Sequence, residues 1–253
     1  MLDPSASPQL WLDTGVMIYH GSAIDAQEHS HNAIQITWPI KHQSLILGGK
    51  EIHTACVIAA QQAHSLSLEF GWVILIEPQS SLGELIAHSL SGSCYRALDL
   101  PQESDLLKPG LMNNADELLA GLEPVWQALN IDYLGLGNNL HLDARIGQLV
   151  QKLDQCLIAD CIKPESWLAV TVAQSLGLSE GRFLHLFKQE MKIAWRPYLL
   201  WRRLLCAVNV LKSGRNATEA AYIAGFSDSA HLSRTFKKMF GVTIRQAQSA
   251  LIK

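Results

Sequence analysis

The sequence predicts an α+β protein in which a strand-rich N-terminal half with a helical appendage precedes an all-α C-terminal half. Two observations carry this prediction: the apolar period changes from two residues to a helical spacing along the chain, and the net charge changes sign between the halves. The 253 residues are 48% hydrophobic and 17% charged, which excludes a disordered or fibrous chain. Because domains commonly contain about 100 to 200 residues, we expect two.

The N-terminal half contains short segments typical of β-strands. Residues 34–38 and 66–70 alternate apolar and polar side chains, and residues 72–76 form an apolar run of strand length. The dipeptide Gly48-Gly49 predicts a hairpin, because glycine adopts the positive φ that tight hairpin turns require. Several short strands separated by turns indicate a β sandwich or a small barrel.

Helical spacing begins after these strands. Ser80 or Ser81 can cap a helix that Gly92 can end, and a second helical segment covers residues 115–130, with Pro124 in the first turn of its latter part. The apolar faces of both segments fit either dimerisation or packing against the barrel. The Gly- and Asn-containing stretch 131–140 is the expected linker, so we predict domains at 1–135 and 136–253.

The charge distribution differs between the two halves. Residues 1–140 contain 4 Lys and Arg against 15 Asp and Glu, whereas residues 141–253 contain 16 against 8. A basic domain attracts polyanions because each neutralised phosphate releases a counterion, whereas an acidic domain is repelled by nucleic acid. The charge difference therefore suggests that the two halves have different functions. The alternative is that surface charge varies along the chain without function, and charge alone does not decide between these two interpretations.

The sequence contains no segment typical of a membrane span or a secretion signal. Apolar runs such as 72–76 fall far short of the roughly 20 residues that a bilayer span needs, and the start lacks a basic region followed by an apolar stretch. The five cysteines are odd in number and scattered, which favours a reducing compartment. We therefore expect a cytoplasmic protein without a membrane partner.

An internal repeat lies in the basic half. The pattern Ala-x-x-x-Gly-apolar-Ser occurs at residues 173–179 and again 48 residues later, at 221–227. Glycine lets the chain turn at the end of one helix, the apolar residue fills the angle between two helices, and serine can cap the second helix. The repeat predicts two helix-turn-helix units, at about 166–190 and 216–240.

A connecting helix is predicted between these units. Apolar residues from Tyr198 to Leu211 follow helical spacing over about 15 residues, or about 22 Å. With the widths of the packed units added, the two second helices would lie roughly 34 Å apart, which is one turn of B-DNA. One chain could therefore enter two successive major grooves.

Residues 166–250 resemble the DNA-binding domain of AraC-type (AraC/XylS) bacterial transcription regulators. The resemblance is carried by LGLSEGRFLHLFKQEMKIAWRPYLLWRRL and TEAAYIAGFSDSAHLSRTFKKMFGVT. Three residues depart from the pattern: Lys192 replaces a usual glycine, Ile244 a proline and Ala247 an aromatic residue. The resemblance implies a sequence-specific DNA-binding transcription regulator that responds to a small-molecule effector and binds double-stranded promoter DNA. The resemblance also implies RNA polymerase as a possible partner and a homodimer as a possible state.

The resemblance also assigns residues to DNA contact. Leu184 and His185 fall on base-facing positions, although Leu184 can offer only apolar contact, as with a thymine methyl group. Arg234 is the candidate for bidentate guanine recognition, with a phosphate clamp or an ion pair with Glu219 or Asp228 as alternatives. Arg202 and Arg203, on the connecting helix, are expected to be solvated or paired. The assigned residues are Arg182, Leu184, His185, Lys188, Ser229, Ala230, Ser233, Arg234 and Lys237.

Histidines in the acidic half resemble the cupin pattern, in which an HxH motif and a distant His hold a metal inside a β barrel. Gln35 occupies a position where cupins usually have Glu, and the second motif lacks its Gly and Pro. We expect a cupin-like sensor barrel with hydrogen-bonded histidines, no metal and no cofactor. The expected effector-binding residues are His29, His31, Gln35, Trp38 and His64.

Two alternatives to this interpretation remain. The first is a metal-dependent cupin enzyme, an oxygenase or isomerase with a helical appendage, which would retain stoichiometric iron, manganese or zinc that is lost on His29→Ala and His31→Ala. The second is a regulator that has lost its effector. Our interpretation assigns no catalytic residue.

Overall fold

The computed structural model describes residues 8–101, 114–133, 142–158 and 167–251. These residues divide between two compact units, one containing Met1–Asn138 and Ser233–Lys253, the other Asn139–Leu232. The predicted linker, apart from residues 131–133, and the predicted boundary at 135/136 lie outside the described residues. That boundary therefore stays a prediction.

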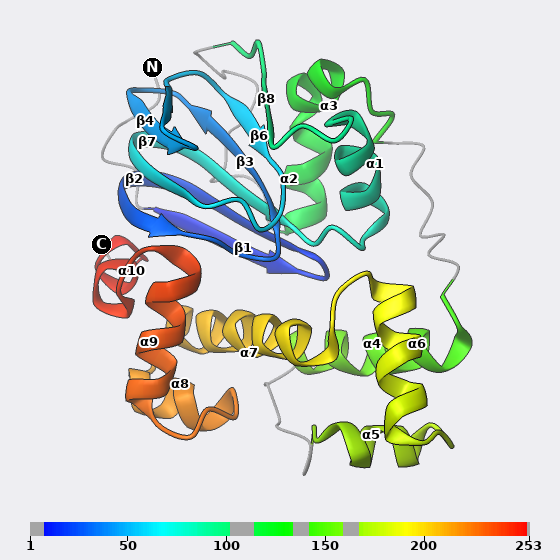
Figure 1. Cartoon of the computed structure of the whole chain (residues 1–253). Helices are drawn as coiled ribbons and strands as arrows, with labels where there is room; N and C mark the ends of the chain where they lie inside the picture. The colour runs from blue at the N-terminus through cyan, green and yellow to red at the C-terminus, as the bar shows by residue number, and fades with distance from the viewer. Residues whose placement is uncertain (1–7, 102–113, 134–141, 159–166, 252–253) are drawn as a thin grey trace. The chain divides into compact units, whose positions relative to one another are not determined.

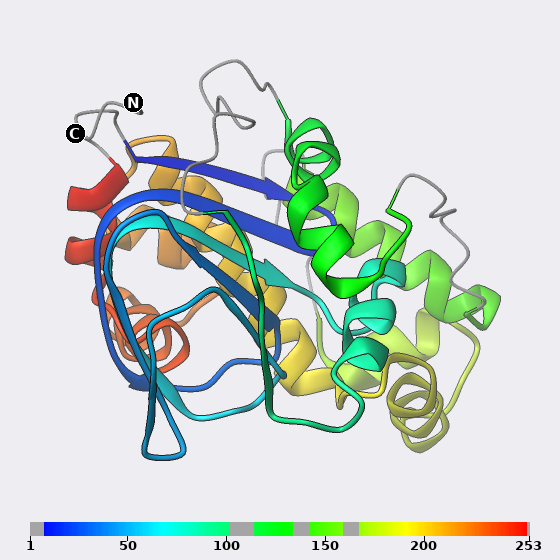
Figure 2. The same ribbon diagram turned by 90° about the horizontal axis from the view of Figure 1, so that it is seen from above.

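The N-terminal part is an antiparallel eight-stranded sheet, as the sequence predicts. The central path runs β1-β2-β7-β3-β6-β8, while β4 pairs with β7 and β5. Figure 2 shows that these strands curl instead of lying flat. The strands are β1 (Gln9–Asp13), β2 (Val16–His29), β3 (Ile34–Pro39), β4 (Gln43–Leu47), β5 (Lys50–Ile52), β6 (Cys56–Ile58), β7 (His64–Ile76) and β8 (Tyr95–Ala97).

Glycines shape this sheet at two places. Gly48 and Gly49 have φ values of 57° and 78° in the turn between β4 and β5, which confirms the predicted hairpin. Segments 66–70 and 72–76, which we expected as two strands, instead form the single strand β7. Gly71 keeps this strand continuous, because a Cβ there would lie 2.4 Å from the carbonyl oxygen of Trp38 on the neighbouring strand.

Three helices pack on the sheet: α1 (Ser81–Ser89), α2 (Ala115–Gly121) and α3 (Glu123–Leu129) (Figure 1). The Ser80 side chain accepts from the backbone N–H of Gly83 and caps α1, and Pro124 stands in the first turn of α3. Their apolar residues share one hydrophobic core with β2, β3 and β7. Of the two uses open to these faces, packing against the sheet is the one observed.

The described residues after position 142 contain helices and no strand. Two of these helices, α4 and α7, are joined by an ion pair between Asp154 and the buried Arg202. The connecting helix α7 has 18 residues, somewhat more than the expected 15. The helices are α4 (Ala144–Ile158), α5 (Ala169–Ser175), α6 (Glu180–Met191), α7 (Trp195–Lys212), α8 (Ala217–Ile223), α9 (Ser229–Phe240) and α10 (Ile244–Leu251).

Candidate DNA-binding helices and a histidine cluster

The first repeat forms a helix-turn-helix from α5 and α6. Gly177 adopts φ 66°, and the backbone N–H of Leu178 donates to the carbonyl of Ala173 over 2.9 Å, which closes the end of α5. The side chain of Ser179 then accepts from the N–H of Arg182 and caps α6. Each residue of the repeat thus has the predicted role.

The second repeat forms the same turn between α8 and α9. Gly225 has φ 77°, and the N–H of Phe226 donates to the carbonyl of Ala221 over 2.8 Å, the bond equivalent to that in the first repeat. The expected cap at Ser227 is wrong. Asp228 accepts from the N–H of His231 over 2.6 Å, because α9 begins one residue later than expected, at Ser229.

Both second helices bury one face and expose the other. Phe183, Leu186 and Phe187 of α6 are buried, as are Leu232 and Phe236 of α9. The residues assigned to DNA contact are on the exposed faces, except that Ser229 is half-buried; Leu184 is 37% exposed. The exposed residues are Arg182, Leu184, His185, Lys188, Ala230, Ser233, Arg234 and Lys237.

The carboxylates considered as partners for Arg234 make other bonds. Glu219 accepts from the backbone N–H of Asn216 in the capping box of α8, and Asp228 caps α9. Arg202, which we expected to be solvated or paired, forms an ion pair with Asp154. Side chains on the outer face of α9 therefore offer positive charge to a ligand.

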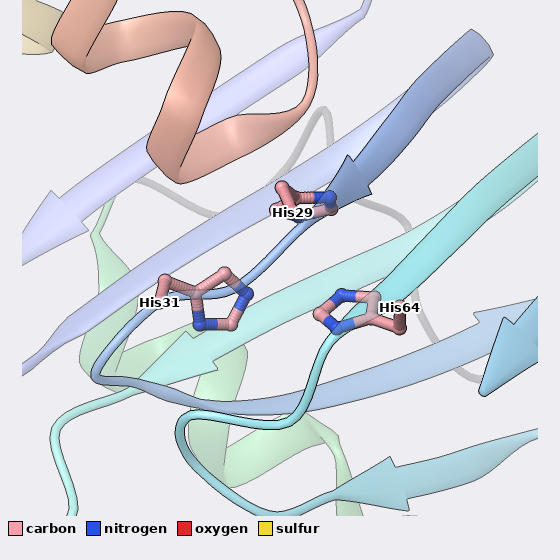
Figure 3. Close-up of side chains that lie close together, drawn as sticks. All are labelled: His29, His31 and His64. Atoms are coloured by element: carbon pink, nitrogen blue, oxygen red, sulfur yellow. The ribbon is translucent and has the colours of Figure 1, made fainter. Parts of the chain in front are cut away.

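A histidine cluster lies in the N-terminal domain (Figure 3). The register of β2 and β7 places His29 opposite His64, with a bulge between Ala26 and His29, and His31 follows in the turn before β3. The three side chains are buried, and one nitrogen of each lies within 4.8 Å of the others. Among the described residues, no other group of three or more His, Cys, Asp or Glu side chains has potential ligand atoms within 4.8 Å of one another.

Gln35 completes this cluster from β3. Its side chain is 3% exposed, and its Oε1 lies 3.0 Å from Nε2 of His31 and 3.3 Å from Nε2 of His64. Four of the five expected effector-binding residues are thus brought together. Trp38 is not placed with them: it lies an odd number of residues from Gln35, so the two side chains leave β3 on opposite faces. Trp38 belongs to the hydrophobic core, where its Nε1 donates to the carbonyl of Pro101.

Backbone carbonyls hold the three imidazole rings, a feature that sequence reasoning missed. Each Nδ1 lies near the carbonyl of a residue two positions away: Gln27 for His29 at 2.8 Å, Ala33 for His31 at 3.0 Å and Gln62 for His64 at 2.9 Å. No side-chain signal marks these positions, because any residue carries a carbonyl. To predict these contacts, one would need to know how the backbone turns around each histidine.

Burial keeps the clustered histidines neutral. Desolvation, followed by the nearby charge of His64, lowers the pKa of His29 to about 4 and that of His31 to about 3. Desolvation also lowers the pKa of His64 itself. Neutral imidazole is the form that binds metals.

None of the helices with described residues is both long and apolar enough to cross a membrane.

Comparison with known proteins finds similarity in the helical part. Residues 172–250 match the family model described as a helix-turn-helix domain. The HTH-type transcriptional activator RhaS of Salmonella schwarzengrund (strain CVM19633) is 35% identical over 124 residues, which are 47% of this chain and 41% of that protein. The chain thus matches less than half the length of this curated relative.

Solved structures of ToxT from Vibrio cholerae share the fold. ToxT from strain O395 has a TM-score of 0.53 at 15% identity, over 93% of this chain and 97% of that one. Wild-type ToxT from strain SCE256 with a bound unsaturated fatty acid has a TM-score of 0.51 at 15% identity, over 99% and 98%. Both contain the arrangement of a sheet-rich N-terminal part and a helical C-terminal part found here.

Proposed function

We propose that the chain is a sequence-specific DNA-binding transcription regulator of the AraC-type helix-turn-helix family. The observation that carries this proposal is the duplicated helix-turn-helix. Both copies close their turn with the same backbone bond, Leu178 to Ala173 and Phe226 to Ala221, and both present an exposed second helix. Second helices of this motif enter the major groove.

The residues proposed to contact DNA divide by chemistry. Arg234 can donate two hydrogen bonds to O6 and N7 of guanine, and His185 offers a polar group to a base edge. Arg182, Lys188 and Lys237 suit phosphates. Helix α9 also carries the half-buried Ser229 and the exposed Ala230 and Ser233. In this proposal, their small side chains determine how closely α9 approaches the bases.

The N-terminal domain is the proposed sensor for a small-molecule effector. The fatty-acid complex of ToxT supports a small-molecule ligand for a chain of this fold. The regulatory effect requires that the effector bind two states of the regulator with unequal affinity. We propose RNA polymerase and a second copy of the chain as further partners. The proposed location is the cytoplasm. The proposed activity is DNA binding and not catalysis.

The test is selection of binding sites from random double-stranded oligonucleotides by the full-length chain, followed by genome-wide mapping of bound DNA. A regulator of this type is expected to enrich one motif with two elements about one helical turn apart. Binding without any sequence preference, even at low salt, would overturn the proposal. The genes beside the mapped sites would indicate candidate effectors, which thermal unfolding can then test.

A further inference from the structure

The second helices of the two repeats, α6 and α9, can be matched residue by residue through their caps and buried faces. Up to the turn the two repeats are 48 residues apart, but past it they are 49 apart, because Ser179 caps α6 whereas Asp228 caps α9. The buried faces have the same offset, since Phe187 of α6 corresponds to Phe236 of α9. Residues 49 apart therefore hold equivalent positions on the two helices.

Three exposed positions of α6 and α9 correspond in this way, and they differ in chemistry. On α9 two of the three side chains carry hydrogen-bonding groups, whereas on α6 only one does. From these positions α6 therefore offers a base edge fewer hydrogen bonds than α9 does. The matched pairs are Gly181 with Ala230, Leu184 with Ser233 and His185 with Arg234.

Leu184 places an apolar side chain on a charged helix face. Its side chain is exposed, and so are the cationic Arg182 and Lys188 and the acidic Glu180 of the same helix. The two cations outnumber the carboxylate, so this face attracts a polyanion. In the major groove, the apolar group that a base edge presents is the 5-methyl group of thymine. Leu184 therefore suits contact with a thymine.

Gly181 lies three residues before Leu184, so the two are neighbours on the helix surface. The backbone does not require a glycine there, because the φ of Gly181 lies outside the left-handed region. Packing does not require it either, since a Cβ would meet no atom within 4 Å. Glycine lowers helix stability relative to alanine, but it permits close approach of the backbone to a ligand. The open space beside Leu184 thus suits a base that comes close to α6.

We propose that Leu184 determines specificity by packing against the 5-methyl group of a thymine, and that Gly181 lets α6 approach this base closely. The two elements of the DNA site then differ: the one bound by α6 contains this thymine, and the one bound by α9 contains the guanine that Arg234 recognises. The inference rests on the proposed function and deepens it, because it names the base chemistry that one half of the DNA site must have.

The experiment measures the affinity of the full-length chain for its selected DNA site with each thymine replaced in turn by deoxyuridine, which lacks only the methyl group. One replacement should weaken binding about fourfold, the effect expected for one buried methyl group. Leu184→Ala should weaken binding to the unmodified site and lose the response to that replacement. Leu168→Ala, which removes a leucine that is 66% exposed in the same helix-turn-helix unit, should leave both the affinity and the response unchanged.

A measurement on the wild-type chain keeps the inference testable if a variant fails to fold. With cytosine in place of the identified thymine, methylation of that cytosine at its 5-position should restore the contact and tighten binding about fourfold. The Leu184→Ala chain should bind the two cytosine sites equally. A selected site in which no thymine methyl group affects binding would overturn the proposal, as would an effect that persists in Leu184→Ala.

Gly181→Ala separates DNA contact from helix stability. It should raise the melting temperature by a few degrees, as should the control Gly147→Ala within α4, because alanine favours a helix. Only Gly181→Ala should weaken DNA binding, by about fivefold or more, which is the lower end of the cost of one mismatched base pair. Unchanged DNA binding by Gly181→Ala would overturn the role assigned to this glycine.

The selection of DNA sites distinguishes the two proposals. If the wild-type chain selects no sequence, the proposed function is refuted and this inference falls with it. If the chain selects a site but does not respond to the removal of any thymine methyl group, this inference alone is refuted.

Discussion

Arg202 of α7 forms an ion pair with Asp154 of α4, and its side chain is only 4% exposed. The pair joins the first helix of the C-terminal part to the helix that connects the two repeats. A guanidinium at this depth depends on its partner, because an isolated buried charge is strongly unfavourable.

Asp154→Ala should therefore lower the free energy of unfolding by about 3 to 5 kcal/mol, since it removes the carboxylate that balances the charge of the buried guanidinium. Arg202→Met, which removes the charge but keeps apolar volume, should be less harmful. The control is Asp143→Ala, which breaks the more exposed Arg145–Asp143 pair and also removes the Oδ1 that accepts from the backbone N–H of Arg145 at the start of α4. It should cost about 1 to 2 kcal/mol. Urea unfolding measures all three, and equal losses for Asp154→Ala and Asp143→Ala would contradict the assigned role.

Two residues with positive φ flank α6. One is a glycine, which adopts this conformation without strain, and the other is a lysine, which does not. Lys192 has φ 56° at its C-terminal end, where the related regulators usually have glycine, and Gly177 has φ 66° ahead of its start. Lys192→Gly should raise stability by about 1 kcal/mol, because glycine avoids the left-handed strain. Gly177→Ala should lower it by a similar amount, although a Cβ there meets no atom within 4 Å.

Thermal unfolding of the two single variants tests this prediction. Gly147→Ala is the control, because Gly147 lies within α4 and a Cβ there also meets nothing within 4 Å. That substitution should stabilise the chain by about 0.5 to 1 kcal/mol. The same sign for Gly177→Ala and Gly147→Ala would show that backbone conformation does not govern the turn.

Arg234 and Lys237 should differ in how they affect DNA binding. Arg234→Ala should weaken binding to the selected site by about 1 to 3 kcal/mol and relax specificity at one base pair. Lys237→Ala should weaken binding to all sequences and reduce the salt slope by about 1. Arg145→Ala, which removes an arginine already paired with Asp143, is the control. Unchanged affinity in both α9 variants, measured by titration at several salt concentrations, would remove these assignments.

The stability of the N-terminal domain should depend on pH through His20. Burial lowers the pKa of His20 to about 4, and its ring packs against Phe70 and Trp72. Because the unfolded chain takes up the proton near pH 6.5, the stability present above that pH is lost progressively as the pH falls towards 4. His20→Phe should remove about 1 to 2 kcal/mol of the loss between pH 7 and pH 5.

Urea unfolding of the wild-type and His20→Phe chains at both pH values measures this difference. The clustered histidines also contribute to the pH dependence, but equally in both chains, so they cancel. An identical loss of stability in the wild-type and His20→Phe chains would contradict the prediction.

The sequence by itself determined the duplicated helix-turn-helix, because its signals are local. A glycine at positive φ, an apolar residue after it and a helix cap all act within about seven residues, so the repeats at 173–179 and 221–227 could be read directly. The same reasoning failed by one residue at Ser227, where the neighbouring Asp228 competes for the same capping position. It also missed β2, whose polar residues and Gly21 hide a 14-residue strand.

The resemblance to cupins grouped the three histidines and Gln35, but only the tertiary structure decided how they meet and that Trp38 does not join them. His29 and His64 are far apart in sequence, and they meet because the register of β2 against β7 pairs them, with a bulge that shifts that register just before His29. Strand register depends on pairing between distant segments, which no local pattern specifies. For the same reason Gln35 joined the cluster, while Trp38, three residues later on the same strand, was directed into the hydrophobic core.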